Sequence, residues 1–171
     1  MPDYIAIREP KAAGPDGLMV GMRALRGILA AGFICGVLDG LCAIAISAYY
    51  GIGPVRVFRG IARGLVGRSA VQGGLGTALL GLGLHFMIAT GAAAVYYLAS
   101  RWMPVLIRRA LVCGIAFGAV VEVVMAFVVV PLSAIGRRPF NLNSFIVLLL
   151  VHMFVVGPSI SLTLHRNELF V

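Results

Sequence analysis

Four apolar runs, each close to the thickness of a lipid bilayer, constrain the fold of this chain more than any other feature. They cover about residues 27–50, 75–99, 110–131 and 145–164 of the 171-residue sequence. A helix needs about 20 residues to cross the roughly 30 Å hydrocarbon core of a bilayer. Inside that core only helices and closed barrels satisfy every backbone hydrogen bond. We therefore predict an all-α, polytopic integral membrane protein whose four transmembrane helices form a bundle.

The distribution of charge fits a membrane protein and excludes one other class. The chain is 61% hydrophobic and 12% charged, with a net charge of +8. Between the terminal tails, the acids Asp39 and Glu122 lie inside apolar runs, so every loop charge is basic. Basic loops suit anionic lipid headgroups. A nucleic-acid-binding protein presents its basic residues on an accessible face, so we expect a bilayer with anionic lipids as the partner and no nucleic acid.

The segments outside the apolar runs divide the chain into two parts. Residues 1–26 form a polar N-terminal tail and lead-in, and residues 27–171 form the transmembrane domain. Within the first loop, residues 54–70 predict an amphipathic helix, because Pro54 suits a first helical turn. Arg56, Arg59 and Arg63 share one face of this helix, beside an apolar face. We expect an interfacial helix with its arginines among lipid phosphates; a substrate-binding role for the arginines is the alternative.

Each transmembrane run carries an ionisable residue close to its centre. These residues are Asp39, His85, Glu122 and His152. A charged group at that depth costs about 2.5–3.5 kcal/mol on insertion scales, and such residues normally face the bundle interior and pair with one another. We therefore predict that the four side chains meet at the axis of the bundle as one polar cluster.

Glycines adjoin both acids at a spacing that brings helices together. Small residues four apart let two helices approach closely in lipid, and five glycines follow this spacing: Gly32, Gly36 and Gly40 around Asp39, and Gly114 and Gly118 before Glu122. We predict that they are helix-packing positions. Each acid-bearing run is also followed by a run that carries a histidine, which favours a two-helix repeat. Pro131 predicts the end of the third helix, and Pro158 predicts a kink in the fourth.

The residue types in the cluster leave several functions open. It could be a structural hydrogen-bond network, as in an accessory subunit that packs against other membrane subunits or against a second copy. It could be a proton- or ion-responsive or transport site, since histidines and carboxylates form proton relays. Asp39, His85, Glu122 and His152 could also ligate zinc, iron or manganese, and the two histidines could hold a haem. The sequence has no nucleophile elbow, P-loop or HExxH motif, so an enzyme is not favoured.

From about His85 to Arg166 the order of features resembles the YagU-type family of bacterial inner-membrane proteins. The shared features are His85, Tyr96 or Tyr97, Pro104, Gly114 and Gly118, Pro131-Leu132, Pro139, His152 and Arg166. Asp39 and Glu122 are not part of the resemblance. It implies a bacterial inner-membrane location and favours a proton-related role. Eight basic residues on the side of the termini, against six on the other, predict cytoplasmic termini.

Overall fold

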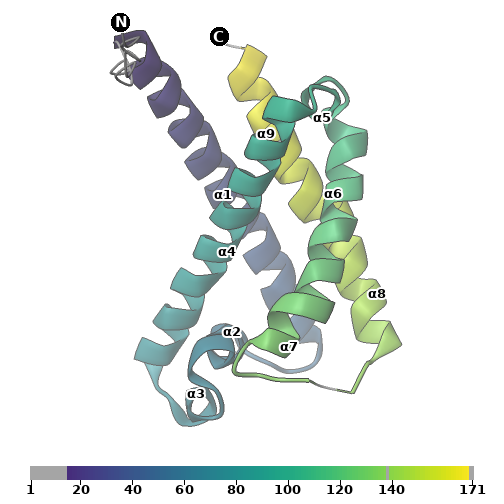
Figure 1. Ribbon diagram of the computed structural model, residues 1–171. Helices are drawn as coiled ribbons and strands as arrows, with labels where there is room; N and C mark the ends of the chain where they lie inside the picture. Colours follow the sequence, from purple (N-terminus) through teal and green to yellow (C-terminus); the bar gives the residue numbers. More distant parts are fainter. Residues whose placement is uncertain (1–14, 138, 170–171) are drawn as a thin grey trace, which may run out of the picture.

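The computed structural model describes residues 15–137 and 139–169, and every element in that part of the chain is helical (Figure 1). The elements are α1 (Pro15–Tyr49), α2 (Pro54–Val66), α3 (Ser69–Gln72), α4 (Leu75–Trp102), α5 (Val105–Arg108), α6 (Ala110–Val124), the π-helix η1 (Met125–Val129), α7 (Val130–Leu132), α8 (Leu142–Val151), the π-helix η2 (His152–Val156) and α9 (Gly157–Leu169). Four continuous helices, α1, α4, α6–α7 and α8–α9, are long and apolar enough to cross a membrane. The predicted all-α bundle is confirmed, and the chain is an integral membrane protein.

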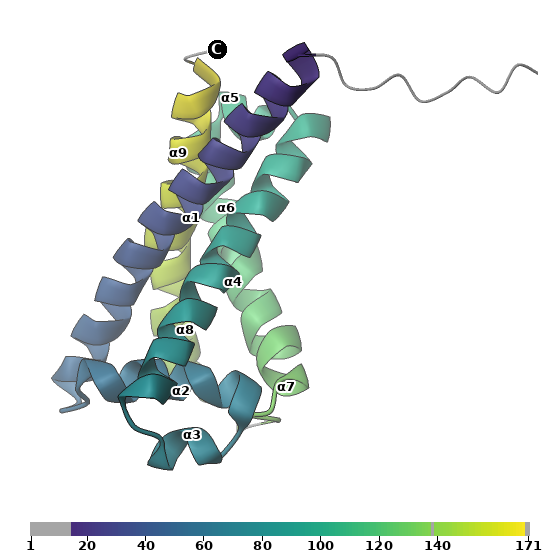
Figure 2. The same ribbon diagram turned by 90° about the vertical axis from the view of Figure 1, so that its left-hand side faces the viewer.

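The helices form a bundle with its connections at two opposite ends. The described ends of α1 and α9 lie at the same end of the bundle as α5 (Figure 1). The short helices α2, α3 and α7 lie at the other end, where α2 runs across the bundle (Figure 2). An even number of crossings places residues 15 and 169, the two described ends, on one side, as the sequence predicts.

Three helix boundaries differ from those expected. Helix α1 begins at Pro15, so the lead-in to residue 26 continues the first transmembrane helix, because its Leu, Met, Ala and Arg residues favour helix. The remainder of the N-terminal tail lies outside the described residues. Helix α2 ends at Val66 rather than near residue 70, since Gly67 takes a φ of +66°, which turns the chain. The last transmembrane helix is longer than expected and begins after Asn141, whose side chain accepts a hydrogen bond from Ser144 N at 2.9 Å.

Helix α2 is amphipathic, and part of its apolar face packs on protein rather than facing outward. Ala62 is buried, and a Cβ atom at Gly81 of α4 would overlap the backbone around Phe58 and lie 3.1 Å from Ala62 N. Only a glycine allows this approach of two backbones. By contrast, Val55 and Leu65 are exposed. The amphipathic helix therefore covers the start of α4 with one part of its apolar face and leaves the other part uncovered.

The glycines beside the acids lie where helices touch. On α1, Cβ atoms at Gly32 and Gly36 would meet Thr90 and Phe86 of α4, and one at Gly40 would lie 3.3 Å from His85 Nε2. On α6, a Cβ at Gly118 would overlap the backbone of His152. Gly114 faces Gly157, and a Cβ there would lie 3.0 Å from the Gly157 carbonyl oxygen. These contacts hold α1 against α4 and α6 against η2 and α9.

Two prolines shape the third and fourth transmembrane helices through π-helical turns. Val130, just before Pro131, donates its N–H to Met125 O, and Gly157, just before Pro158, donates its N–H to His152 O. Both bonds span five residues instead of four. The helix ends at Leu132, one residue after Pro131. At Pro158 the chain inserts a π turn and continues as α9, because the wider turn accommodates the proline ring that an α-helix interior excludes.

The hydrophobic core lies in the half of the bundle nearer the termini. Small and medium side chains of α1, α4 and α9 make up most of it: Ala31, Cys35, Ala89, Ala93, Tyr96, Val156, Ile160 and Leu164. Tyr96 is fully buried and donates its hydroxyl to Leu106 O at 2.7 Å. The core ends near the depth of the ionisable residues, and the other half of the bundle contains a cavity.

Candidate functional site

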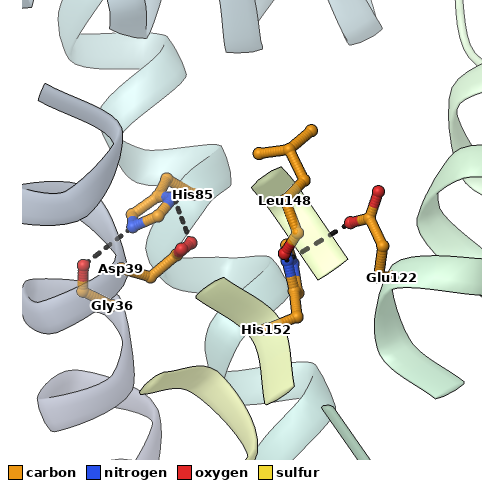
Figure 3. A network of polar contacts seen from close by, with 6 residues as sticks. All are labelled: Gly36, Asp39, His85, Glu122, Leu148 and His152. Carbon is orange, nitrogen blue, oxygen red and sulfur yellow. Dashed lines mark hydrogen bonds and ion pairs between the residues drawn. The ribbon is translucent and has the colours of Figure 1, made fainter. Parts of the chain in front are cut away.

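The first acid–histidine pair joins α1 to α4. His85 Nε2 lies 2.8 Å from Gly36 O, and His85 Nδ1 lies 4.0 Å from Asp39 Oδ2 (Figure 3). A carbonyl oxygen only accepts, so Nε2 carries a hydrogen and donates it to Gly36. The other ring nitrogen, Nδ1, is therefore the one that faces the carboxyl group of Asp39.

The second pair joins α6 to η2. His152 Nδ1 lies 2.8 Å from Leu148 O in its own helix and 3.2 Å from Glu122 Oε2 (Figure 3). Because Leu148 O only accepts, Nδ1 carries a hydrogen, and the Glu122 carboxyl group shares it. Glu122 is the more enclosed acid, with 4% of its side chain exposed against 24% for Asp39. The second pair is thus satisfied with a neutral imidazole ring.

The structure divides the four predicted residues into two pairs rather than one cluster. Among the described residues, no group of three or more His, Cys, Asp or Glu side chains is close enough to hold a metal ion. The glycine contacts explain the division, because they hold each acid-bearing helix against the next transmembrane helix and not against the other half. Each pair therefore consists of residues from consecutive transmembrane helices, as a two-helix repeat predicts.

The hydrogen bonds also bear on the expected ligand roles. His85 uses Nε2 for Gly36 O, and His152 uses Nδ1 for Leu148 O and Glu122. In His152, Nε2 remains available to a ligand. In His85 only Nδ1 remains available, and it faces Asp39. A ligand of His85 would therefore have to bind Nδ1 from the side of Asp39, while Nε2–H stays bonded to Gly36 O.

Both pairs line one cavity of about 1190 Å³ between the two halves of the bundle. Its walls come from α1, α2, α4, α6, η1, α7, α8 and η2, and from the segment between α7 and α8. The cavity extends from the acid–histidine pairs to Arg137, Phe140 and Asn141, which are exposed. It therefore opens at the end of the bundle away from the termini, and also along the side of the bundle, where the lining residues Ile88, Phe127 and Val128 are exposed.

Sequence reasoning missed two parts of this site. One is a group of three aromatic rings on the cavity wall, Phe127, Phe140 and Phe145, whose centroids lie 5.5–6.0 Å apart. The other is the pair of backbone carbonyls, Gly36 O and Leu148 O, that fix the histidine tautomers. The aromatic residues are visible in the sequence, but they lie on separate helices and a loop, so their proximity has no local signal.

The three arginines of α2 differ in their surroundings. Arg56 is exposed, while Arg59 donates its Nε–H to Ala70 O at 3.0 Å and so ties α2 to α3. The Nε atom of the half-buried Arg63 has no hydrogen-bond partner among the described residues. Arg56 is the one whose exposure best suits a lipid phosphate.

Comparisons with known protein families, with curated proteins and with solved structures found no match to this chain. The fold and the site geometry therefore carry the functional argument. They describe an integral membrane protein in which two acid–histidine pairs line a shared cavity.

Proposed function

We propose that this protein is a proton-responsive transport module in which the acid–histidine pairs exchange protons with the central cavity. The observation that carries this proposal is the geometry of the Asp39–His85 pair. With Nε2–H donated to Gly36 O, the lone pair of a neutral Nδ1 would point toward a carboxylate 4.0 Å away. That arrangement is repulsive in a low-dielectric interior. A proton on either Nδ1 or the carboxyl group removes this repulsion, and we propose that the pair holds one.

The position of this proton suits exchange. A separation of 4.0 Å is longer than a direct hydrogen bond, so the proton is not held in a short bond between the two groups. Both side chains also line the cavity, where water can reach them. Ionisable residues within the membrane are the usual components of proton pathways. The pair can therefore take up and release a proton without separating α1 from α4.

The Glu122–His152 pair supplies a second exchange position. His152 is satisfied as a neutral ring, and its Nε2 is the atom that accepts a further proton. The two pairs differ in geometry, because Nδ1 of His152 already donates to a carbonyl group, whereas Nδ1 of His85 faces Asp39 without a hydrogen bond. Two sites of different geometry on one cavity favour a module that responds to pH over a uniform structural network.

We further propose that the membrane is a bacterial inner membrane and that the termini lie in the cytoplasm. The resemblance to YagU-type proteins supports the first point, and the excess of basic residues on the side of the termini supports the second. In this orientation the cavity opens toward the periplasm.

Proton movement into proteoliposomes tests the proposal. Vesicles containing a trapped pH-sensitive dye receive an inside-negative potassium diffusion potential, and the internal pH is followed. The wild-type protein should acidify the interior faster than protein-free vesicles. Asp39→Asn should reduce the rate to that of protein-free vesicles, because the amide cannot take up the proton. Cys42→Ser, one turn away on α1 and outside the cavity, should retain it.

Folding of each variant is checked by circular dichroism and size-exclusion chromatography in detergent. If wild-type protein in sealed vesicles moves no protons beyond the protein-free rate, the transport proposal is rejected. The accessory-subunit interpretation makes a separate prediction, which is that a fixed second protein co-purifies in mild detergent. Finding such a partner together with no proton movement would favour that interpretation.

A further inference from the structure

The cavity is much larger than proton exchange requires. A proton needs only a chain of water molecules, whereas the volume of about 1190 Å³ slightly exceeds the roughly 300–1,000 Å³ of sites that enclose organic ligands. The wall combines aliphatic and aromatic side chains with a few polar groups, which is the composition of a small-molecule site. The question is which chemical class of ligand these polar groups select.

The charged and titratable groups on the cavity wall favour a cation. They are Cys35 and Asp39 from α1, His85 from α4, Glu122 from α6, Arg137 from the loop and His152 from η2. The acids lie deep among helices, whereas Arg137 is exposed at the opening. An exposed charge acts through water and is screened, but a buried carboxylate acts through a low dielectric. The enclosed part of the cavity therefore attracts positive charge.

The buried carboxyl group of Glu122 is the one that a positive charge in the cavity would stabilise most. With 4% of its side chain exposed, its carboxyl group must either be neutralised by a proton or, as a carboxylate, have a counter-charge nearby. The neutral His152 ring supplies only an N–H that it shares with Leu148 O. A cation that enters the cavity can take the place of the proton on this carboxyl group.

The apolar part of the wall indicates the body of the ligand. Phe127, Phe140 and Phe145 form a ring cluster toward the cavity opening. Aromatic rings pack favourably against apolar and aromatic groups, in stacked or edge-to-face arrangements. An inorganic cation would make no apolar contact with these rings, so the site fits a cation that carries apolar or aromatic groups.

We propose that the cavity binds a lipophilic organic cation, with its positive charge between Glu122 and Asp39 and its apolar body against the three phenylalanines. Binding displaces a proton: the carboxyl O–H bond breaks, the electron pair stays on the oxygen, and the proton passes to water in the cavity. This inference rests on the proposed function, because the same carboxyl groups exchange the proton.

Tetraphenylphosphonium and tetraphenylborate, which share shape and size but carry opposite charges, test the proposal by calorimetric titration of detergent-purified protein. Tetraphenylphosphonium should bind saturably and more tightly as pH rises. The binding heat should change with the ionisation enthalpy of the buffer, which reports the released proton. Glu122→Gln and Asp39→Asn should each weaken binding, whereas Cys42→Ser should leave it unchanged.

Saturable binding of tetraphenylborate in preference to the phosphonium ion, or no saturable phosphonium binding to wild-type protein, overturns the inference. Binding without buffer-dependent heat overturns the exchange step. If Glu122→Gln fails to fold, Asp39→Asn and the buffer measurement on wild-type protein still decide. The two proposals can also be separated. If wild-type protein does not bind the phosphonium ion but still acidifies vesicles in its absence, this inference is refuted and the proposed function stands.

Discussion

The contact between Gly118 of α6 and the backbone of His152 offers the sharpest test of how the two helices pack at the site. A Cβ atom at Gly118 would overlap the His152 carbonyl group and lie 2.9 Å from Met153 Cα. These neighbours are backbone atoms, so no side-chain rotation can relieve the overlap. Gly118→Ala should therefore push η2 away from α6 and displace His152 from Glu122.

A matched substitution isolates the cost of this contact. Gly83 lies on the exposed face of α4, and a Cβ there has no neighbour within 4 Å. Both glycines lie inside helices, so replacing either with alanine gains about 0.8–1.0 kcal/mol of helix propensity. Overpacking a close contact costs about 1–3 kcal/mol. The free energy of unfolding of Gly118→Ala should thus fall about 1–3 kcal/mol below that of Gly83→Ala.

Unfolding in mixed micelles with increasing SDS mole fraction, followed by far-ultraviolet circular dichroism, measures this difference. Gly83→Ala should unfold at the same or a higher SDS fraction than wild-type protein, and Gly118→Ala at a lower one. Equal stabilisation by both substitutions would falsify the close approach of α6 and η2, and with it the placement of the Glu122–His152 pair.

Two further substitutions test other contacts of the fold. Tyr96→Phe leaves Leu106 O without its donor and should lower the free energy of unfolding by about 1–3 kcal/mol, whereas Tyr97→Phe, whose hydroxyl has no partner among the described residues, should change it little in the same SDS titration. Gly81→Ala should detach α2 from α4, because the new Cβ would overlap the backbone at Phe58; proteolysis within α2 should become faster while the far-ultraviolet spectrum stays helical, and unchanged protection would contradict the docking.

Much of the fold follows from the sequence because lipid leaves few options for a chain. An apolar run of bilayer length must form a helix. The run does not limit the helix, however, since α1 begins at Pro15, well before its apolar run. Depth also follows from counting along a helix, since each residue rises about 1.5 Å. This is why Asp39, His85, Glu122 and His152 could be placed at similar depth before their contacts were known.

The rotation of each helix is harder to predict, and it decides which groups meet. The glycines beside Asp39 and Glu122 indicate packing faces, but not which helix each face contacts. In the structure these faces contact the next transmembrane helix, so two pairs form on either side of a cavity. A cluster at the axis would require the two halves to approach one another as closely as the helices within each half.

The π-helical turns could not be predicted from the sequence for a related reason. Pro131 and Pro158 each remove a backbone donor, and a chain can respond by ending, bending or widening its helix. Pro131 did end a helix within one residue, whereas Pro158 is accommodated by a wider turn that begins at His152. The choice depends on tertiary contacts such as the approach of Gly157 to Gly114.

The two pairs occupy corresponding places in the two halves, yet their hydrogen bonds differ in a way that matters for function. His85 reaches across to a carbonyl of α1, whereas His152 bonds a carbonyl of its own helix. The first arrangement fixes the ring between two helices and leaves its other nitrogen facing Asp39 at 4.0 Å. The second leaves a nitrogen uncommitted and the acid enclosed. This asymmetry supports the proposed proton exchange, because proton transfer requires neighbouring groups that differ in their affinity for a proton.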